Sequence, residues 1–206
     1  MNTVPGNRLE YFEAIAPRWE DVVDPGRIRR RLLPVLDELA IGADEQILDL
    51  GCGTGILTSL LLPRLSARGR VSAVDFSGAM LELAREKIPD RRVTWIPSDA
   101  ASLPLPDACM DRAIAFSTWP HFPDPDRVIR ELRRVLRPGG TFHVIHIDSR
   151  STINAIHSNA GGAIGHDHLV PASDLAAALG RMGFQAASIT DDAERYVVSA
   201  TRGPAS

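Results

Sequence analysis

Cysteine is scarce in this chain of 206 residues, which contains only Cys52 and Cys109, far apart and not spaced as a metal-binding pair. Two cysteines give no disulfide framework, so we expect a reducing compartment. No apolar run approaches the roughly 20 residues that span a bilayer, and the N-terminal region has no apolar segment of signal length. These absences predict a cytoplasmic protein with no membrane partner.

The chain also has no excess of basic over acidic residues. It has 23 Lys and Arg against 26 Asp and Glu, a formal charge of −3, and so it has no electrostatic footprint for nucleic acid. Hydrophobic residues make up 44% and charged residues 24%, as in ordinary globular chains. We find no repeat, long linker or low-complexity segment, and 206 residues suffice for one full core. Residues 1–206 are therefore predicted to form a single domain.

The most informative stretch is ILDLGCGTG, residues 47–55, an apolar run that ends in a glycine-rich turn before a helix-like segment. Its three glycines can adopt backbone angles closed to other residues and let a ligand approach the main chain. Asp49 brings a carboxylate to the same rim. A strand, such a turn and a helix open a nucleotide-type site in an open α/β sheet. A dinucleotide fingerprint needs a small residue where Ile56 stands, which disfavours a nicotinamide oxidoreductase.

Two further carboxylates follow the next predicted strands. Asp75 ends the run at 70–75, where a carboxylate can accept hydrogen bonds from both hydroxyls of a ribose. Asp99 follows the run at 92–96 and is placed to accept from the exocyclic amine of an adenine.

In order and spacing, ILDLGCGTG, VDFSGAML, PSDA and LRPGGTF resemble the class I S-adenosylmethionine-dependent methyltransferases over residues 45–147. The resemblance implies that the glycine turn holds the methionine part of S-adenosyl-L-methionine and that the two later acids hold its ribose and adenine. The cofactor contacts that we expect are Tyr11, Asp49, Gly51, Cys52, Gly53, Gly55, Asp75, Phe76, Met80, Asp99, Ala100 and Phe116.

Periodicity predicts helices at 8–23, 26–39, 55–66, 77–87, 124–136, 149–159 and 172–182, and strands at 46–50, 70–75, 92–96, 110–116, 141–147, 184–190 and 195–201. The resemblance implies an α/β, Rossmann-like, doubly wound sheet of seven strands in the order 3-2-1-4-5-7-6, with strand seven antiparallel, plus N-terminal helices. We expect an N-terminal helical cap at 1–40, a cofactor-binding core at 45–147 and a substrate-side insertion at 148–170.

The acceptor side is expected beyond the carboxyl ends of the strands. His121 follows the fourth predicted strand and His146 ends the fifth, which makes them the candidate catalytic residues. The candidate substrate contacts are Trp19, Trp119, Arg150 and His157. Phe12 and Trp19 recur at helical spacing and fit a buried helix face equally well, whereas Tyr11 lies one position off that stripe and is the better candidate for a site contact.

Two alternatives stay open. His121, His146, His157 and His166 would bind a metal if the loop at 161–165 folds back over the strand ends, although their spacing matches no compact zinc signature. Polar residues lining a substrate pocket are the favoured interpretation. The sequence thus predicts methyl transfer to a small-molecule acceptor, and the alternative function is a regulatory or non-methylating protein that binds the same cofactor. A monomer and a homodimer fit equally.

Overall fold

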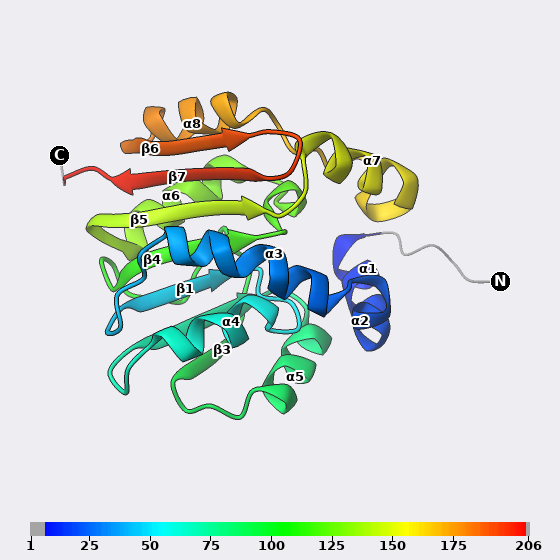
Figure 1. Ribbon diagram of the computed structural model, residues 1–206, viewed down its shortest axis with the longest axis horizontal. Coiled ribbons are helices and arrows are strands. Elements are labelled where there is room, and N and C mark those ends of the chain that lie inside the picture. Colours follow the sequence, from blue (N-terminus) through cyan, green and yellow to red (C-terminus); the bar gives the residue numbers. More distant parts are fainter. Residues whose placement is uncertain (1–6, 205–206) are drawn as a thin grey trace.

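One seven-stranded sheet organises the part of the chain that the computed structural model describes, residues 7–204, with the side chains at 186–187 excepted (Figure 1). Its strands are β1 Gln46–Leu50, β2 Arg70–Asp75, β3 Val93–Pro97, β4 Met110–Phe116, β5 Leu136–His146, β6 Phe184–Asp191 and β7 Tyr196–Arg202. The order is β3-β2-β1-β4-β5-β7-β6, and β7 runs antiparallel to both of its neighbours. The predicted α/β fold is confirmed.

Apolar residues explain why the central strands pair as they do. In β1, Ile47, Leu48 and Leu50 are fully buried, and Leu48 lies opposite Ala113 of the parallel β4. Parallel strands that are covered on both faces need such nearly continuous apolar runs. Because β1 to β5 pair in parallel, their carboxyl ends lie at one edge of the sheet, and the glycine turn lies at that edge.

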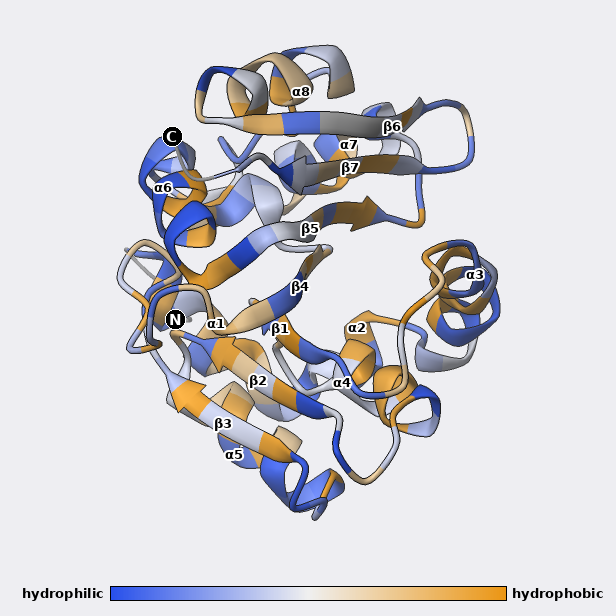
Figure 2. Ribbon diagram, turned by 90° about the vertical axis from the view of Figure 1, so that its left-hand side faces the viewer, coloured by the Kyte–Doolittle hydropathy of each residue, from blue (hydrophilic) through white to orange (hydrophobic). Residues whose placement is uncertain are grey.

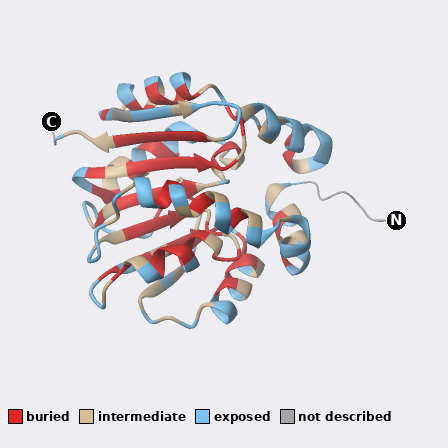
Figure 3. Cartoon of the chain, viewed as in Figure 1, coloured by how far each residue is buried: buried red, intermediate tan, exposed pale blue. Residues whose placement is uncertain are grey.

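Helices cover both faces of the sheet, which makes it doubly wound. The α-helices of the described residues are α1 Arg8–Ile15, α2 Trp19–Val22, α3 Pro25–Glu38, α4 Ile56–Leu61, α5 Gly78–Lys87, α6 Pro125–Val135, α7 Arg150–Ala160 and α8 Ala172–Arg181. Side chains of α3, α4 and α5 enter the core on one face, and those of α6 and α8 enter the core on the other. The strands and inward helix faces are apolar and buried, while the outward helix faces are polar and exposed (Figures 2 and 3). No helix in residues 7–204 has the length and apolar character required to cross a membrane.

Proline shortens two of the predicted helices. The expected helix at 8–23 divides into α1 and α2 around a 3-10 turn at Ala16–Arg18 that contains Pro17. The expected helix at 55–66 ends early, as α4 followed by the 3-10 turn Leu62–Arg64 around Pro63. Proline lacks the amide hydrogen that continues an α-helix, so each segment tightens at that point.

Strand β5 begins earlier than predicted. It pairs with β4 at Leu136, and the register then shifts before Thr141. Gly139, with a φ of 80°, lies within this irregular stretch. The regular part of β5 corresponds to the predicted strand.

The N-terminal cap consists of α1 and α2. Phe12 and Ala16 form a small core with Met80 of α5 and with Ile164, which lies in the segment after α7. Glu13 accepts a hydrogen bond from the Ser77 hydroxyl at 2.9 Å, which ties α1 to the start of α5. Helix α3, which was also expected in the cap, packs on the sheet instead.

Candidate active site

The turn after β1 leaves bare backbone at the carboxyl edge of the sheet. Gly51, Gly53 and Gly55 have φ values of 72°, 52° and 83°, a region that favours glycine. A Cβ on Gly51 would lie 2.3 Å from the Thr118 hydroxyl oxygen, whereas a Cβ on Gly53 would meet no atom within 4 Å. A Cβ on Gly55 would lie 2.8 Å from Ile88 at the end of α5. Gly55, a predicted cofactor contact, therefore serves helix packing, and Gly53 leaves the open space.

Asp49 lies almost fully buried beneath this turn. Its Oδ2 accepts a hydrogen bond from the Thr58 hydroxyl at 2.6 Å, while Oδ1 is buried and has no hydrogen-bond partner among residues 7–204. Burial raises the pKa of Asp49 to about 7; the charge of Asp75 adds to this rise, and the bond from Thr58 opposes it. A buried carboxylate oxygen without a partner is costly unless a donor or a cation satisfies it.

Asp75 joins the glycine turn to α5. Its carboxylate accepts from the amides of Gly53 at 2.8 Å and Ser77 at 2.9 Å. The Ser77 hydroxyl in turn accepts from the Met80 amide at 3.2 Å and caps α5. Burial raises the pKa of Asp75, and the amide bonds oppose that rise. The second predicted carboxylate therefore lies beside the first.

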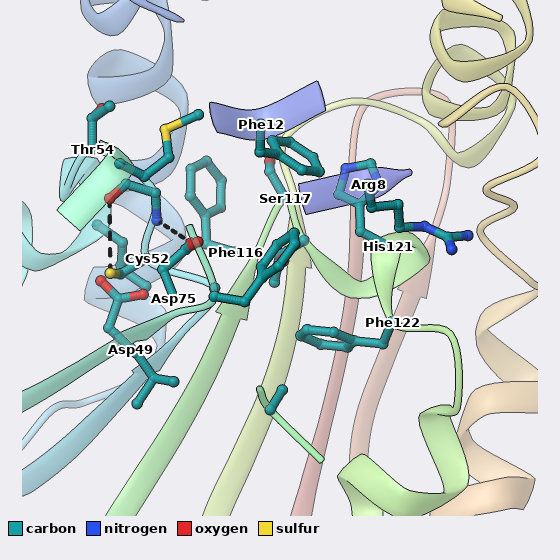
Figure 4. Close-up of a pocket in the computed structure, with 18 of the residues that line it drawn as sticks. Arg8, Phe12, Asp49, Cys52, Thr54, Asp75, Phe116, Ser117, His121 and Phe122 are labelled. Carbon is teal, nitrogen blue, oxygen red and sulfur yellow. Dashed lines mark hydrogen bonds between the residues drawn. The ribbon is translucent and has the colours of Figure 1, made fainter. Parts of the chain in front are cut away.

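A cavity of about 390 Å³ opens over these strand ends (Figure 4). The predicted site residues that line it are Trp19, Asp49, Gly51, Cys52, Gly53, Asp75, Phe76, Met80, Asp99, Ala100, Phe116 and His121. Phe12, for which the sequence left a site contact and a buried helix face equally open, also lines it, and the unpredicted residues include Asn7, Arg8, Thr54, Ser117, Thr118 and Phe122. In Figure 4, Asp49, Cys52 and Asp75 lie at one side of the cavity, and Arg8 and His121 lie at the other.

His121 is held by a buried carboxylate from the insertion. Its Nδ1 lies 2.7 Å from Oδ2 of Asp167, a residue that is only 4% exposed. Arg8 of α1 binds the same carboxylate with two nitrogens, including Nε at 3.1 Å from Oδ1. Burial alone would raise the pKa of Asp167, but the hydrogen bonds from His121 and Arg8 lower it below its usual range. Three segments distant in sequence meet at this carboxylate.

His157 supports the same residue without lining the cavity. Its Nδ1 lies 3.0 Å from the Asp167 carbonyl oxygen, and its ring centre lies 4.8 Å from that of His121. Burial, and then the charge of His121, lower the pKa of His157. The sequence predicted that His157 contacts substrate. In the structure it lies behind His121 and contacts Asp167 and the His121 ring.

His146, the second catalytic candidate, does not line the cavity. It is fully buried and packs edge to face against Tyr196 at 5.9 Å. Alternation along β5 turns its side chain toward the same face as Val144. Burial, with smaller contributions from His121 and His157, lowers the pKa of His146 to about 3.

Three other predicted contacts also lie away from the cavity. Tyr11 packs against Phe12 with ring centres 5.3 Å apart, and Phe12, on the helical stripe, is the residue that lines the cavity. Trp119 is buried in the core, 5.5 Å from Phe122. Arg150 forms an ion pair at 3.0 Å with a carboxylate at the end of β6. Each side chain is already satisfied by packing or by charge.

The sequence analysis missed Asp167 and Arg8. Asp167 follows His166, one of the possible metal ligands, yet nothing in the spacing distinguishes it from a solvated acid. It lies 46 residues from His121 and 159 residues from Arg8. The one available signal was the combination of histidine and aspartate in the segment after β5.

The metal alternative finds no support in this arrangement. Within residues 7–204, no group of three His, Cys, Asp or Glu side chains is placed to hold an ion, and this includes His121, His146, His157 and His166. Cys52 lines the cavity, but burial raises the pKa of its thiol well above the usual value. It is therefore a poor thiolate ligand.

Residues 48–144 match a family described as a methyltransferase domain. That stretch contains the glycine turn, both buried carboxylates and the central strands. Residues 48–144 of the chain belong to the class I S-adenosylmethionine-dependent methyltransferases. S-adenosylmethionine is the cofactor that this family uses, in agreement with the prediction from the sequence.

Methyltransferase relatives include two bacterial proteins. Methyltransferase GfsG of Streptomyces halstedii is 35% identical over 124 residues, 58% of this chain and 44% of the relative. A demethylmenaquinone methyltransferase of Lactiplantibacillus plantarum is 31% identical over 135 residues, 62% of this chain and 57% of the relative. The chain thus spans about half the length of these relatives.

A solved methyltransferase structure shares the whole fold. It is a putative methyltransferase of Haloferax volcanii in complex with the Trm112 methyltransferase activator, with a TM-score of 0.76. The two sequences are 18% identical, and the alignment covers 94% of this chain and 98% of that one. At this identity the likeness shows the fold alone.

The residues at the turn fit the methyltransferase cofactor. Oδ1 of Asp49 and Oγ1 of Thr54 are buried without a partner among residues 7–204, and an ammonium group would satisfy such oxygens. Gly53 leaves space beside them. Asp75 and Asp99 line the same cavity and supply acceptors for hydroxyl and amine groups.

Proposed function

We propose that the protein transfers the methyl group of S-adenosylmethionine to a small, largely apolar molecule bound in the cavity above β1, β2 and β4. One observation supports this most: Asp49, with one carboxylate oxygen unpartnered among residues 7–204, and Gly53, with open space around it, line a cavity whose wall also includes aromatic side chains and His121. The chain's formal charge of −3 disfavours nucleic acid as the acceptor. We place the reaction in the cytoplasm, since both cysteines are free.

The protein's own residues would mainly bind, align and exclude water. Asp49, the glycine turn, Asp75 and Asp99 would hold the cofactor, which supplies a methyl group activated by its positively charged sulfur. Phe12 and Trp19, on the cap, line the cavity and restrict access of water to it. Holding two reactants in contact lowers the barrier because little translational freedom remains to be lost.

Titration calorimetry with S-adenosylhomocysteine tests the cofactor site. We expect wild-type protein to bind the ligand and Gly53→Val to lose binding, because a side chain would fill the open space. Gly139→Val is a matched control: Gly139 also has a positive φ and open space around it, but it lies in β5 away from the cavity. Equal binding by all three proteins would contradict the proposed site.

A turnover assay distinguishes methyl transfer from a regulatory or non-methylating role of the same cofactor site. Formation of S-adenosylhomocysteine with a panel of small acceptors, followed by mass spectrometry, would establish the reaction and the methylated atom. Tight cofactor binding without turnover on any acceptor would favour the regulatory or non-methylating alternative.

A further inference from the structure

The contact between His121 and Asp167 fixes the orientation of an imidazole at the cavity wall. An ionised carboxylate can only accept, so the bond of 2.7 Å assigns the proton to Nδ1 of His121. Nε2 is then the ring nitrogen that carries a lone pair, and no hydrogen bond of Nε2 occurs within residues 7–204. A ring that is fixed in this way presents a base to a ligand in the cavity.

The surroundings of His121 keep this tautomer. The groups with titratable charge that face it are Asp167 from the loop before α8, Arg8 from α1, His157 from α7 and, further back, His146 from β5. Asp167 is kept ionised by its partners, and the two neighbouring histidines are kept neutral by burial. Among these groups, Arg8 is the permanent cation, and the carboxylate of Asp167 pairs with it and with Nδ1 of His121.

The cavity beside His121 suits a flat apolar molecule. Phe12 lies between the rings of His121 and Phe76, with ring centres 5.1 Å and 5.7 Å away. Phe116 and Phe122 line the adjoining wall. Aromatic walls favour stacking of planar apolar groups. A neutral imidazole is a suitable base for a hydroxyl acidic enough to share its proton near neutral pH.

We propose that Asp167 is the positioning residue for His121 and that His121 deprotonates a phenolic or enolic hydroxyl on the acceptor. This inference rests on the proposed methyl transfer. The acceptor O–H bond breaks, its proton moves to Nε2, and the oxygen electron pair forms the bond to the methyl carbon. The electrons of the broken carbon–sulfur bond remain on sulfur, so charge and atoms balance.

A coloured phenol tests the base without turnover. 4-Nitrophenol is added at neutral pH to full-length protein saturated with S-adenosylhomocysteine, and the visible absorbance of its anion is measured. We expect wild-type protein to bind the probe and raise the fraction of anion, and His121→Phe to abolish that rise. Failure of the probe to bind, or an equal rise in both proteins, would overturn the proposed acceptor class and the role of His121.

Asp167→Asn tests the positioning role, with Asp148→Asn as the matched control. Asp148 forms a similar carboxylate pair with Arg27, has no hydrogen bond to His121 and does not line the cavity. In proton NMR, the downfield Nδ1–H signal of His121 should be present in the wild type and in Asp148→Asn, and absent in Asp167→Asn. A signal that persists in Asp167→Asn would overturn the assignment.

Kinetics on a methylated phenol, once found, give a second measurement. His121→Ala should lower kcat by about 10²–10⁴-fold. Asp167→Asn should lower kcat more than it changes KM, whereas the control Asp148→Asn should leave both close to the wild-type values. Equal kcat in the wild type and Asp167→Asn, or an equal loss in both variants, would contradict a positioning role for Asp167.

Two outcomes separate this inference from the proposed function. If S-adenosylhomocysteine does not bind, the proposed function fails. If it binds and turnover occurs without dependence on His121, only the inference fails. A stoichiometric metal in purified protein that is lost in His157→Ala would also overturn it, because His121 would then be a ligand and not a base.

Discussion

Protonation of Asp49 should control how tightly the protein binds S-adenosylhomocysteine below neutral pH. Burial raises the pKa of this residue to about 7 in the unliganded protein. Its buried Oδ1 is without a partner in residues 7–204 and is the proposed acceptor for the ammonium group of the ligand. An ammonium partner favours the ionised carboxylate. Binding below pH 7 then requires loss of a proton, so affinity should fall as pH decreases.

The magnitude follows from the pKa. About one pH unit below it, roughly one tenth of Asp49 is ionised, so the dissociation constant should rise about tenfold, or about 1.4 kcal/mol. Thr58→Val should move this midpoint to higher pH. The Thr58 hydroxyl donates to Oδ2 at 2.6 Å and opposes the effect of burial.

Calorimetry between about pH 5.5 and pH 8, in two buffers of different ionisation enthalpy, measures both the affinity and the protons released. Wild-type protein should release close to one proton per ligand at the acid end. Asp49→Asn should bind more weakly at pH 8 and show no such release, while titration of the ligand amine near pH 8 stays common to both proteins. Parallel pH profiles of the wild type and Asp49→Asn below pH 7 would refute the assignment.

The same pKa has a consequence for the stability of the unliganded protein. Because the pKa of folded Asp49 lies above the unfolded value, the folded state binds more protons between about pH 4 and pH 7. Stability from this residue should be full below that window and be lost as pH rises through it. In Asp49→Asn, Tm should therefore fall less between about pH 4 and pH 7 than in the wild type. If Tm falls equally in both proteins, other groups cause the pH dependence.

Three further changes test the placement of single residues. Asp75→Ala should weaken binding of S-adenosylhomocysteine by about 1–3 kcal/mol in calorimetry, since buried amides lose their acceptor; unchanged affinity would contradict its place in the site. Gly51→Ala should lower Tm more than Gly53→Ala, because its Cβ would lie 2.3 Å from a threonine oxygen; equal Tm values would refute the close packing. Trp119→Ala should lower the free energy of unfolding by about 3–5 kcal/mol in urea denaturation, and Trp19→Ala by less, because only Trp119 is fully enclosed in the core; the reverse order would place Trp119 at the cavity.

Local chemistry predicted most of the strands and helices, whereas the strand order of the sheet came from the resemblance to the methyltransferases. The strand that ends at Leu50, the glycine turn and the acid at Asp75 are neighbours in the chain or follow one strand pattern, so short stretches of sequence contain the whole signal. Helix ends were less predictable. Pro17 and Pro63 tighten a turn without removing the apolar spacing that periodicity detects.

The acceptor side was harder to predict because it depends on which side chains another segment already satisfies. Positions two residues apart after β4 placed both side chains beside the acceptor, Trp119 as a substrate contact and His121 as a catalytic candidate. In the fold, Trp119 turns into the core, while His121 meets a carboxylate supplied by a distant loop. Whether a polar side chain can act on a ligand depends on this competition between partners, since a fully bonded or enclosed group has nothing left to offer.

Asp167 shows how such a partner can remain inconspicuous in sequence and still decide the chemistry of a site. Two side chains donate to this carboxylate, which is only 4% exposed, and they come from the cap and from the loop after β4. Their hydrogen bonds lower its pKa against the effect of burial, so two distant segments keep the group ionised. The orientation of His121 thus depends on a residue 46 positions away in the chain, and that residue also binds Arg8, which lines the same cavity from α1.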